Sequence, residues 1–161
     1  MKNIVQSSVK IRFQDCDPFN HLYNTRYLDY FLNAREDQLL EFYGLNVFQR
    51  LAEGGQIWVV SENQVCYLRP ASMQETVLIE SQLIQATSRS LLVEMRMWDE
   101  NKSILKSILW TNFIYFNIRT QKPEPHPAEL SRLFNEIVLP VEQQTFADRK
   151  RYLTRQTRQR N

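Results

Sequence analysis

The stretch DCDPFNHLYNTRYLDYFLNARE, residues 15–36, decides the fold because it changes from a turn-rich loop to a helical pattern. Pro18 fixes the backbone of the loop among residues that favour turns. Aromatic and apolar side chains then recur three and four positions apart as far as Tyr43, and Gly44 stands where a helix C-cap is expected. The pattern predicts one helix over about residues 25–43, roughly five turns long. Because this helix is apolar on more than one side, we expect the rest of the domain to wrap around it.

Strand patterns lie on both sides of this helix. Before it, Val9, Ile11 and Phe13 alternate with Lys10 and Arg12, which is typical of a half-buried strand. After it, a linker through two adjacent glycines leads into stretches rich in β-branched and aromatic residues. The predicted strands there cover residues 57–68, 76–84, 90–98 and 104–118. Their short connections indicate an antiparallel meander, so we expect an α+β fold in which the long helix covers one face of an antiparallel sheet.

The C-terminal part is predicted to hold a short helix followed by a basic tail. The loop QKPEPHP at residues 121–127 ends the last strand, and apolar residues within 130–137 recur at helical spacing. The chain then becomes polar, so we expect a domain over residues 1–140 and a tail over residues 141–161. The cations of the tail are Arg149, Lys150, Arg151, Arg155, Arg158 and Arg160. We interpret the tail as a solvated terminus that packs weakly on the domain, with contact to an acidic surface as the other reading.

Composition and charge exclude several classes of protein. With 161 residues, the chain is expected to form one domain. Its 20 basic and 18 acidic residues are too balanced to indicate specific nucleic-acid binding, and it contains no glycine-rich phosphate loop. It has no apolar run of membrane-spanning length, and its first ten residues do not resemble a signal peptide. Because Cys16 and Cys66 alone form no disulfide framework, we expect a cytoplasmic protein.

The candidate chemistry lies where the loop meets the helix. Asp15, Asp17, His21 and Asn24 fall within ten residues, at the N-terminus of the predicted helix. Unpaired backbone N–H groups and the positive end of the helix dipole at such a position polarise a carbonyl and stabilise a developing oxyanion. A carboxylate a few residues earlier attacks that carbonyl or activates a water molecule. The residues thus indicate an acyl-hydrolysis site, although a loop aspartate taken alone more often forms an Asx turn or caps a helix.

The same stretch resembles the signature of hotdog-fold acyl-CoA thioesterases of the 4-hydroxybenzoyl-CoA thioesterase type. The resemblance is carried by the D-x-D-P loop, the Y-L-x-Y-F helix, VCYLRPA at residues 65–71 and the TSRS turn at residues 87–90, and it covers about residues 7–135. It implies a hotdog fold, a long central helix wrapped by an antiparallel sheet. It further implies that Asp17 is the nucleophile or general base and that a backbone N–H near Asn24 polarises the thioester carbonyl.

The resemblance also implies residues that bind the substrate. His21 and Tyr27 are expected to contact it, and Arg89 and Ser90 lie in a turn that resembles the family's contacts with the CoA phosphates. Asp15 is interpreted as a structural residue, with His21 as an alternative general base. The family uses no metal or other cofactor, and a neighbouring subunit completes its site. We therefore expect a homodimer or homotetramer that acts on acyl-CoA.

Departures from the family pattern leave the acyl carrier open. Asn20 stands where many close relatives carry glycine, and Phe19 and Tyr23 stand where the related plant acyl-carrier-protein thioesterases have asparagines. Acyl-carrier-protein thioesters therefore remain an alternative substrate. A non-catalytic hotdog protein that binds acyl-CoA or acyl-carrier protein is the second reading, and a dehydratase is the third. His126, in a loop between two prolines, is assigned neither a role nor a partner.

Overall fold

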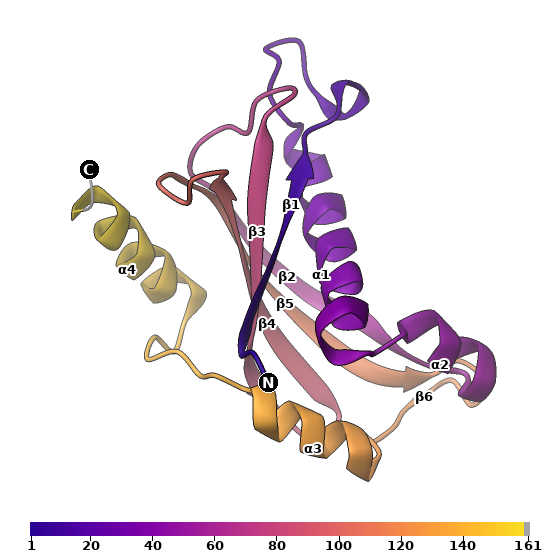
Figure 1. Cartoon of the computed structure of the whole chain (residues 1–161). Helices are drawn as coiled ribbons and strands as arrows, with labels where there is room; N and C mark the ends of the chain where they lie inside the picture. The colour runs from indigo at the N-terminus through magenta and orange to yellow at the C-terminus, as the bar shows by residue number, and fades with distance from the viewer. Residues whose placement is uncertain (160–161) are drawn as a thin grey trace.

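The computed structural model describes the backbone of residues 1–159 and the side chains of residues 1–157. An antiparallel sheet curls around one long helix, α1, which lies across one of its faces (Figure 1). In chain order the elements are β1 (Ile4–Lys10), η1 (Phe13–Asp15), η2 (Asn24–Arg26), α1 (Tyr27–Tyr43), α2 (Val47–Gly54), β2 (Gln56–Tyr67), β3 (Thr76–Ala86), β4 (Ser90–Asp99), β5 (Leu105–Asn117), β6 (Lys122–Pro123), α3 (Ala128–Ile137) and α4 (Phe146–Gln159). The predicted α+β class is confirmed.

The sheet has the strand order β1-β3-β4-β5-β2, and the short β6 pairs with β5. The predicted meander is confirmed for β3, β4 and β5, whose neighbours in the sheet are also neighbours in sequence. It is wrong for β2, which pairs with β5 rather than with β3. The reason is that β1 occupies the outer side of β3, with Val5 opposite Ser81 and Lys10 opposite Thr76. Strands β1 and β2 therefore form the two edges of the sheet.

Helix α1 is held by a buried apolar face and ended by a glycine. Tyr27, Tyr30 and Phe31 are buried in the main hydrophobic cluster together with side chains of β3, β4 and β5. Fully burying a large apolar side chain stabilises the fold by about 1.5–3 kcal/mol, so this face dominates the docking of the helix. Gly44 adopts a φ of 65°, and its N–H donates to the Leu40 carbonyl at 3.0 Å. The predicted C-cap is confirmed.

Helix α2 occupies a segment that the sequence analysis assigned to a linker. Asn46 starts it, because the side-chain oxygen of Asn46 accepts from the backbone N–H groups of Phe48 and Gln49 at 3.1 and 3.0 Å. Gly55, with a φ of 77°, ends it. An asparagine that precedes an apolar pair is a helix-start signal, and the expectation of a linker through Gly54 and Gly55 overlooked it.

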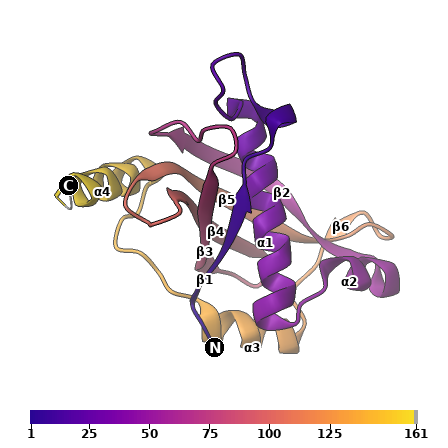
Figure 2. The same cartoon turned by 45° about the horizontal axis from the view of Figure 1, so that its top comes forward.

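The expectation that the basic tail packs weakly is wrong for its described part. Helix α4 lies on the face of the sheet opposite α1 (Figures 1 and 2). Its Leu153 packs with Trp98 and Ile108, and Arg149 donates to both carboxylate oxygens of Glu94, at 2.7 and 2.9 Å. Since Glu94 is fully buried, it requires a cation, and the tail supplies one. The predictions for Arg158 and Arg160 concern side chains outside the described residues.

Among the residues that the structure describes, no helix is both long enough and apolar enough to cross a membrane.

Candidate active site

The D-x-D-P loop folds back on itself as a small hairpin in front of α1. The Asp17 N–H donates to the His21 carbonyl at 2.8 Å, and the Tyr23 N–H donates to the Asp15 carbonyl at 3.0 Å. Asn20 at the tip has a φ of 62°, in the left-handed region that glycine enters freely and asparagine tolerates. This conformation accounts for an asparagine where many relatives carry glycine.

Asp17 uses one carboxylate oxygen to hold this hairpin. Its Oδ1 accepts from the backbone N–H groups of Phe19 and His21 at 2.8 and 3.1 Å, which is an Asx turn. Its Oδ2 accepts no hydrogen bond from the described residues, and the side chain is half-buried. Asp17 can therefore hold the hairpin with Oδ1 while Oδ2 remains available for a reaction.

Asp15 points instead to the helix. Its Oδ2 accepts from the Tyr30 hydroxyl at 2.9 Å, and its Oδ1 lies 3.7 Å from Arg26 Nε. The Tyr30 oxygen in turn accepts from the Arg12 N–H at 2.9 Å. Burial is the main cause that raises the pKa of Tyr30, so the hydroxyl stays protonated and keeps donating. Asp15 therefore ties the loop to α1.

The start of the helix offers unpaired donors. A turn of 3-10 helix, η2, precedes α1, and no side-chain oxygen caps either element. Within the described chain the backbone N–H groups of Asn24 and Thr25 have no hydrogen-bond acceptor, while the Asn24 carbonyl accepts from the Tyr67 hydroxyl at 2.9 Å. Such free N–H groups at a helix start can polarise a carbonyl oxygen placed before them.

Tyr27 and His21 lie beside this site and differ in their burial and contacts. The Tyr27 oxygen accepts from the Ala71 N–H at 3.1 Å, and its ring meets the edge of the Tyr67 ring at 5.0 Å. Burial raises the pKa of Tyr27, which is almost wholly enclosed. His21 is half-buried and forms a backbone bridge to Ser72. Tyr27 is thus a core residue that anchors the β2–β3 loop.

Arg89 and Ser90 lie far from this loop in the same chain. Arg89 lies in the turn between β3 and β4, and Ser90 begins β4. Thr87 Oγ1 accepts from their N–H groups at 3.2 and 2.9 Å. The D-x-D-P loop adjoins the opposite end of β3, since the Ile11 N–H donates to the Glu75 carbonyl just before that strand. Strand β3 has 11 residues and spans roughly 35 Å at about 3.3 Å per residue. The structure brings together Asp15, Asp17, His21, Asn24 and Tyr27, and leaves this turn apart from them.

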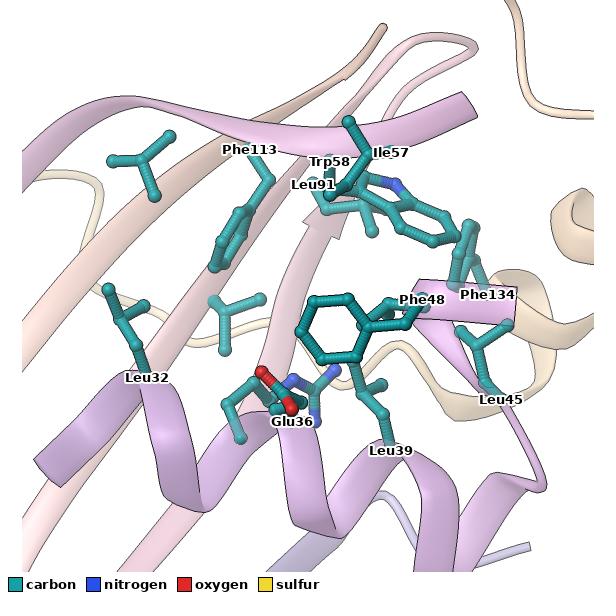
Figure 3. A pocket seen from close by; sticks show the side chains of 14 residues that line it. Leu32, Glu36, Leu39, Leu45, Phe48, Ile57, Trp58, Leu91, Phe113 and Phe134 are labelled. Atoms are coloured by element: carbon teal, nitrogen blue, oxygen red, sulfur yellow. The ribbon is translucent and has the colours of Figure 1, made fainter. Parts of the chain in front are cut away.

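A cavity of about 230 Å3 opens between α1, α2 and the sheet (Figure 3). Its walls are mainly apolar and come from six elements and the loop before α2. They comprise Leu32, Arg35, Glu36, Leu39, Leu45, Val47, Phe48, Ile57, Trp58, Val60, Leu91, Val93, Phe113 and Phe134. Tyr27, which was expected to contact the substrate, does not line this cavity, and neither do Tyr30 and Phe31. Leu32, Glu36 and Leu39 are four and three positions apart, which places them on one face of α1. This spacing is the feature of the sequence from which this wall of the cavity could have been predicted.

His126 has partners that the sequence analysis did not foresee. Its Nε2 accepts from Trp58 Nε1 at 3.1 Å, and its Nδ1 lies 3.2 Å from the Thr87 carbonyl oxygen. This pattern requires a neutral ring with the proton on Nδ1, and burial lowers the pKa of His126 in agreement. His126 therefore holds Trp58, one wall of the cavity, in place.

The described part of the chain shows neither an activated thiol nor a metal-binding cluster at this site. Cys16 donates to the Arg12 carbonyl at 3.3 Å, and burial is the main cause that raises the pKa of its thiol. A thiol with a raised pKa is a poor nucleophile. No group of three His, Cys, Asp or Glu side chains among the described residues is arranged to hold a metal ion.

Known proteins are similar to this chain over most of its length. The model of the thioesterase-like superfamily matches residues 11–134. The chain is 26% identical over 134 residues to the long-chain acyl-CoA thioesterase FadM of Escherichia coli (strain K12), covering 83% of this chain and 99% of that enzyme. The residues that the family model matches include the loop and the helix start.

Two solved structures share the fold at low sequence identity. One is the hypothetical protein SAV2348 from Staphylococcus aureus in complex with CoA, with a TM-score of 0.78 and 15% identity over 91% of this chain and 92% of that one. The other is Slr0204, a 1,4-dihydroxy-2-naphthoyl-CoA thioesterase from Synechocystis, with a TM-score of 0.75 and 14% identity over 85% and 99%. The predicted hotdog fold is confirmed. The chain belongs to the thioesterase-like superfamily, and the predicted class of enzyme, a thioester hydrolase, is confirmed with it.

Proposed function

We propose that this protein hydrolyses acyl-CoA to a free acid and CoA in the cytoplasm, with Asp17 as the reacting carboxylate. The observation that carries the proposal is a carboxylate oxygen, Asp17 Oδ2, that has no partner among the described residues. It lies in the loop directly before a helix start whose first N–H groups likewise lack an acceptor there. Membership of the thioesterase-like superfamily and similarity to a long-chain acyl-CoA thioesterase support acyl-CoA as the substrate. Acyl-carrier-protein thioesters are the alternative substrate.

The N–H groups at the start of η2, near Asn24, receive the thioester oxygen and stabilise the negative charge that develops on it. In the nucleophilic route, Asp17 Oδ2 attacks the carbonyl carbon, the C–S bond breaks, and CoA leaves as a thiolate that takes a proton from water. Water then hydrolyses the acyl-aspartyl anhydride, which releases the acid and restores the carboxylate. In the general-base route, Asp17 removes a proton from the attacking water and passes it to the leaving thiolate.

We infer that the active unit is at least a homodimer, with a tetramer as the larger form. Arg89 and Ser90, proposed to bind the CoA phosphates, are about one strand length from Asp17 in the same chain. A second copy placed alongside supplies that turn to the first. The 12-residue edge strand β2, which pairs on one side only in the described chain, favours such an association.

The test follows thiol release from a panel of acyl-CoA substrates by the purified protein. Asp17→Asn keeps the side-chain oxygen that accepts from Phe19 and His21 but removes the nucleophile or base. We expect turnover to fall 100-fold or more, about 3 kcal/mol at about 1.4 kcal/mol per decade, with the fold retained. Asp37→Asn, at an exposed position of α1, is the matched control and should leave turnover unchanged.

Two results would contradict the proposal. Near-normal turnover in Asp17→Asn would move the chemistry to another residue, and His21 would be substituted next. Tight acyl-CoA binding without any turnover would favour the non-catalytic reading. A parallel assay with acyl-carrier-protein thioesters of the same chain length decides the carrier, with the higher kcat/KM identifying it.

A further inference from the structure

The apolar cavity contains an arginine, Arg35, that forms no ion pair with a carboxylate among the described residues. Arg35 on α1 is 5% exposed and lines the cavity. Within the described residues its charge is influenced by burial and by Tyr43, and by no aspartate or glutamate. Burial lowers the pKa of Arg35 to about 10, so the guanidinium remains charged at neutral pH. A buried cation without an anion is costly unless a ligand supplies an acceptor.

Arg35 uses only part of its hydrogen-bond capacity within the described residues. Its Nη1 donates to Ser81 Oγ at 3.0 Å and a side-chain hydrogen bond links it to Tyr43, whereas a guanidinium carries five N–H donors. Arg35 thus offers free donors at the wall of a cavity that is otherwise mainly apolar.

Glu36 indicates which kind of ligand group can accept a hydrogen bond from Arg35. Its carboxylate lines the same cavity, and Figure 3 shows it on the α1 side, near Leu39 and Phe48. A carboxylate at the end of a ligand would be repelled by Glu36, whereas a hydroxyl accepts from Arg35 and also donates to Glu36. The pair of side chains therefore favours an alcohol.

The position of this pair along α1 sets the distance from the reacting carbonyl. Arg35 follows Asn24 by eleven residues, which is roughly 17 Å along η2 and α1. An extended carbon chain advances about 1.3 Å per bond, from bond lengths near 1.5 Å, so this distance is about 13 bonds. Arginine side chains on a helix lean toward its N-terminus, which shortens the distance by a few bonds. The alcohol then lies about ten to thirteen bonds from the thioester carbon.

The size of the cavity agrees with this placement. Its volume of about 230 Å3 and its mainly apolar walls suit part of an alkyl chain. A chain whose carbonyl lies at the start of η2 reaches this cavity with its distal part. The nearest cavity residue on α1, Leu32, is eight positions beyond Asn24, so the proximal part spans the distance between the two.

We propose that Arg35 and Glu36 recognise a hydroxyl group in the distal half of a long acyl chain, which makes distally hydroxylated long-chain acyl-CoA the preferred substrate class. The proposal rests on the proposed function, because it places the thioester carbonyl at the start of η2.

The test compares kcat/KM for three substrates of equal chain length: octadecanoyl-CoA, 12-hydroxyoctadecanoyl-CoA and 3-hydroxyoctadecanoyl-CoA. We expect the wild-type protein to favour the 12-hydroxy substrate over the other two by about 10-fold, since a hydroxyl at carbon 3 stays near the carbonyl. Arg35→Met removes the donors at similar length and should reduce this ratio to within about twofold. Glu36→Gln, at a half-buried position, should reduce it as well. Arg132→Met, the same change at an exposed position of α3, should keep the wild-type ratio.

A binding measurement separates this proposal from the proposed reaction. Trp58 lines the cavity, so its fluorescence reports the binding of 12-hydroxyoctadecanoic acid and octadecanoic acid without turnover. Tighter binding of the hydroxy acid by the wild-type protein and by Arg132→Met, lost in Glu36→Gln, supports the site even where no substrate is hydrolysed. The proposal is wrong if the wild-type protein shows a ratio of kcat/KM near one between the 12-hydroxy and the unsubstituted substrate. It is also wrong if both Arg35→Met and Glu36→Gln keep the wild-type ratio.

Discussion

Asp15 and Asp17 differ in what their carboxylates contact, although one residue separates them. Asp15 accepts from Tyr30 and lies near Arg26, so its charge holds the loop on α1. Asp17 accepts two backbone N–H groups with one oxygen and leaves the other without a partner among the described residues. Because a reacting carboxylate needs a free lone pair directed at the substrate, these contacts support the assignment of the reaction to the second aspartate.

His126 makes the stability of the protein depend on pH. Burial lowers its pKa below the ordinary value of about 6.5, so the unfolded chain binds a proton more readily than the folded one. The stability that this histidine contributes is fully present above about pH 6.5 and is lost as pH falls through the lower folded pKa. Protonation also places a donor on Nε2, opposite the N–H of Trp58.

We therefore expect the melting temperature of the wild-type protein to fall between pH 7 and pH 5 more steeply than that of His126→Gln. The other titrating groups are common to both proteins, so the difference between the two curves isolates His126. Thermal melts followed by circular dichroism across that range provide the measurement. Parallel curves would show that His126 is not the group responsible.

At the scale of elements, α4 is attached to the sheet by a buried ion network. Glu94 on β4 accepts from Arg149, from Arg96 at 3.0 Å and from Trp110 Nε1 at 2.8 Å. Val93 and Met95, its neighbours along the strand, face α1, so Glu94 faces the opposite side by the alternation of side chains in a strand. The helix thus covers charges that β4 cannot leave unpaired.

Arg149→Met should destabilise the protein by about 2–3 kcal/mol. This loss is smaller than the 3–5 kcal/mol expected for an isolated buried charge, because Arg96 still pairs with Glu94. Arg151→Met is the matched control on the same helix: its pair with Asp148 is exposed, and the change should cost less than about 0.5 kcal/mol. Urea unfolding of the two variants measures both values. If both variants were as stable as the wild-type protein, the attachment of α4 through Arg149 would contribute little to the stability of the fold.

Gly44→Ala should destabilise the protein by about 1 kcal/mol, because an alanine is strained at a φ of 65°. The position is otherwise open: a methyl group there would meet no atom within 4 Å. The cost therefore comes from the backbone alone, and thioesterase activity should be unchanged. Denaturant unfolding and a turnover assay on the same preparation test both statements. A loss well above 2 kcal/mol would indicate a packing defect instead of backbone strain.

At the scale of the whole molecule, the separation of Asp17 from Arg89 predicts a site shared between two copies. Asp17→Asn and Arg89→Ala should each lower kcat/KM for acyl-CoA. If each site takes Asp17 from one copy and Arg89 from the other, a mixed dimer of the two variants has one intact site. Random mixing makes about half of the dimers mixed, so about a quarter of the wild-type sites should be restored.

The measurement mixes the two variants, exchanges their subunits at low denaturant and follows activity and mass by light scattering. Two preparations of the same variant treated alike are the control and should show no gain. No recovery in mixed dimers, or full activity of a monomer at micromolar concentration, would contradict the shared site.

The sequence by itself determined the features that depend on near neighbours. Helix α1 and its glycine end follow from side-chain spacing and backbone sterics, and the turn around Asp17 involves residues at most four positions away. The D-x-D-P motif, which carried the family resemblance, is equally local. These features were predicted because hydrogen bonds between adjacent residues do not depend on the rest of the fold.

Only the tertiary structure decided which distant residues meet. Arg149 reaches Glu94 across 55 positions, and Trp58 reaches His126 across 68. The strand order, with β2 beside β5 and β1 beside β3, assembles the cavity around Arg35 and places Arg89 far from Asp17. Strand register and helix docking set these contacts, and both result from the burial of the whole core. A local pattern of polar and apolar residues contains no information on that sum. The packing of the tail through Arg149 and Leu153 and the partners of His126 were therefore not predicted.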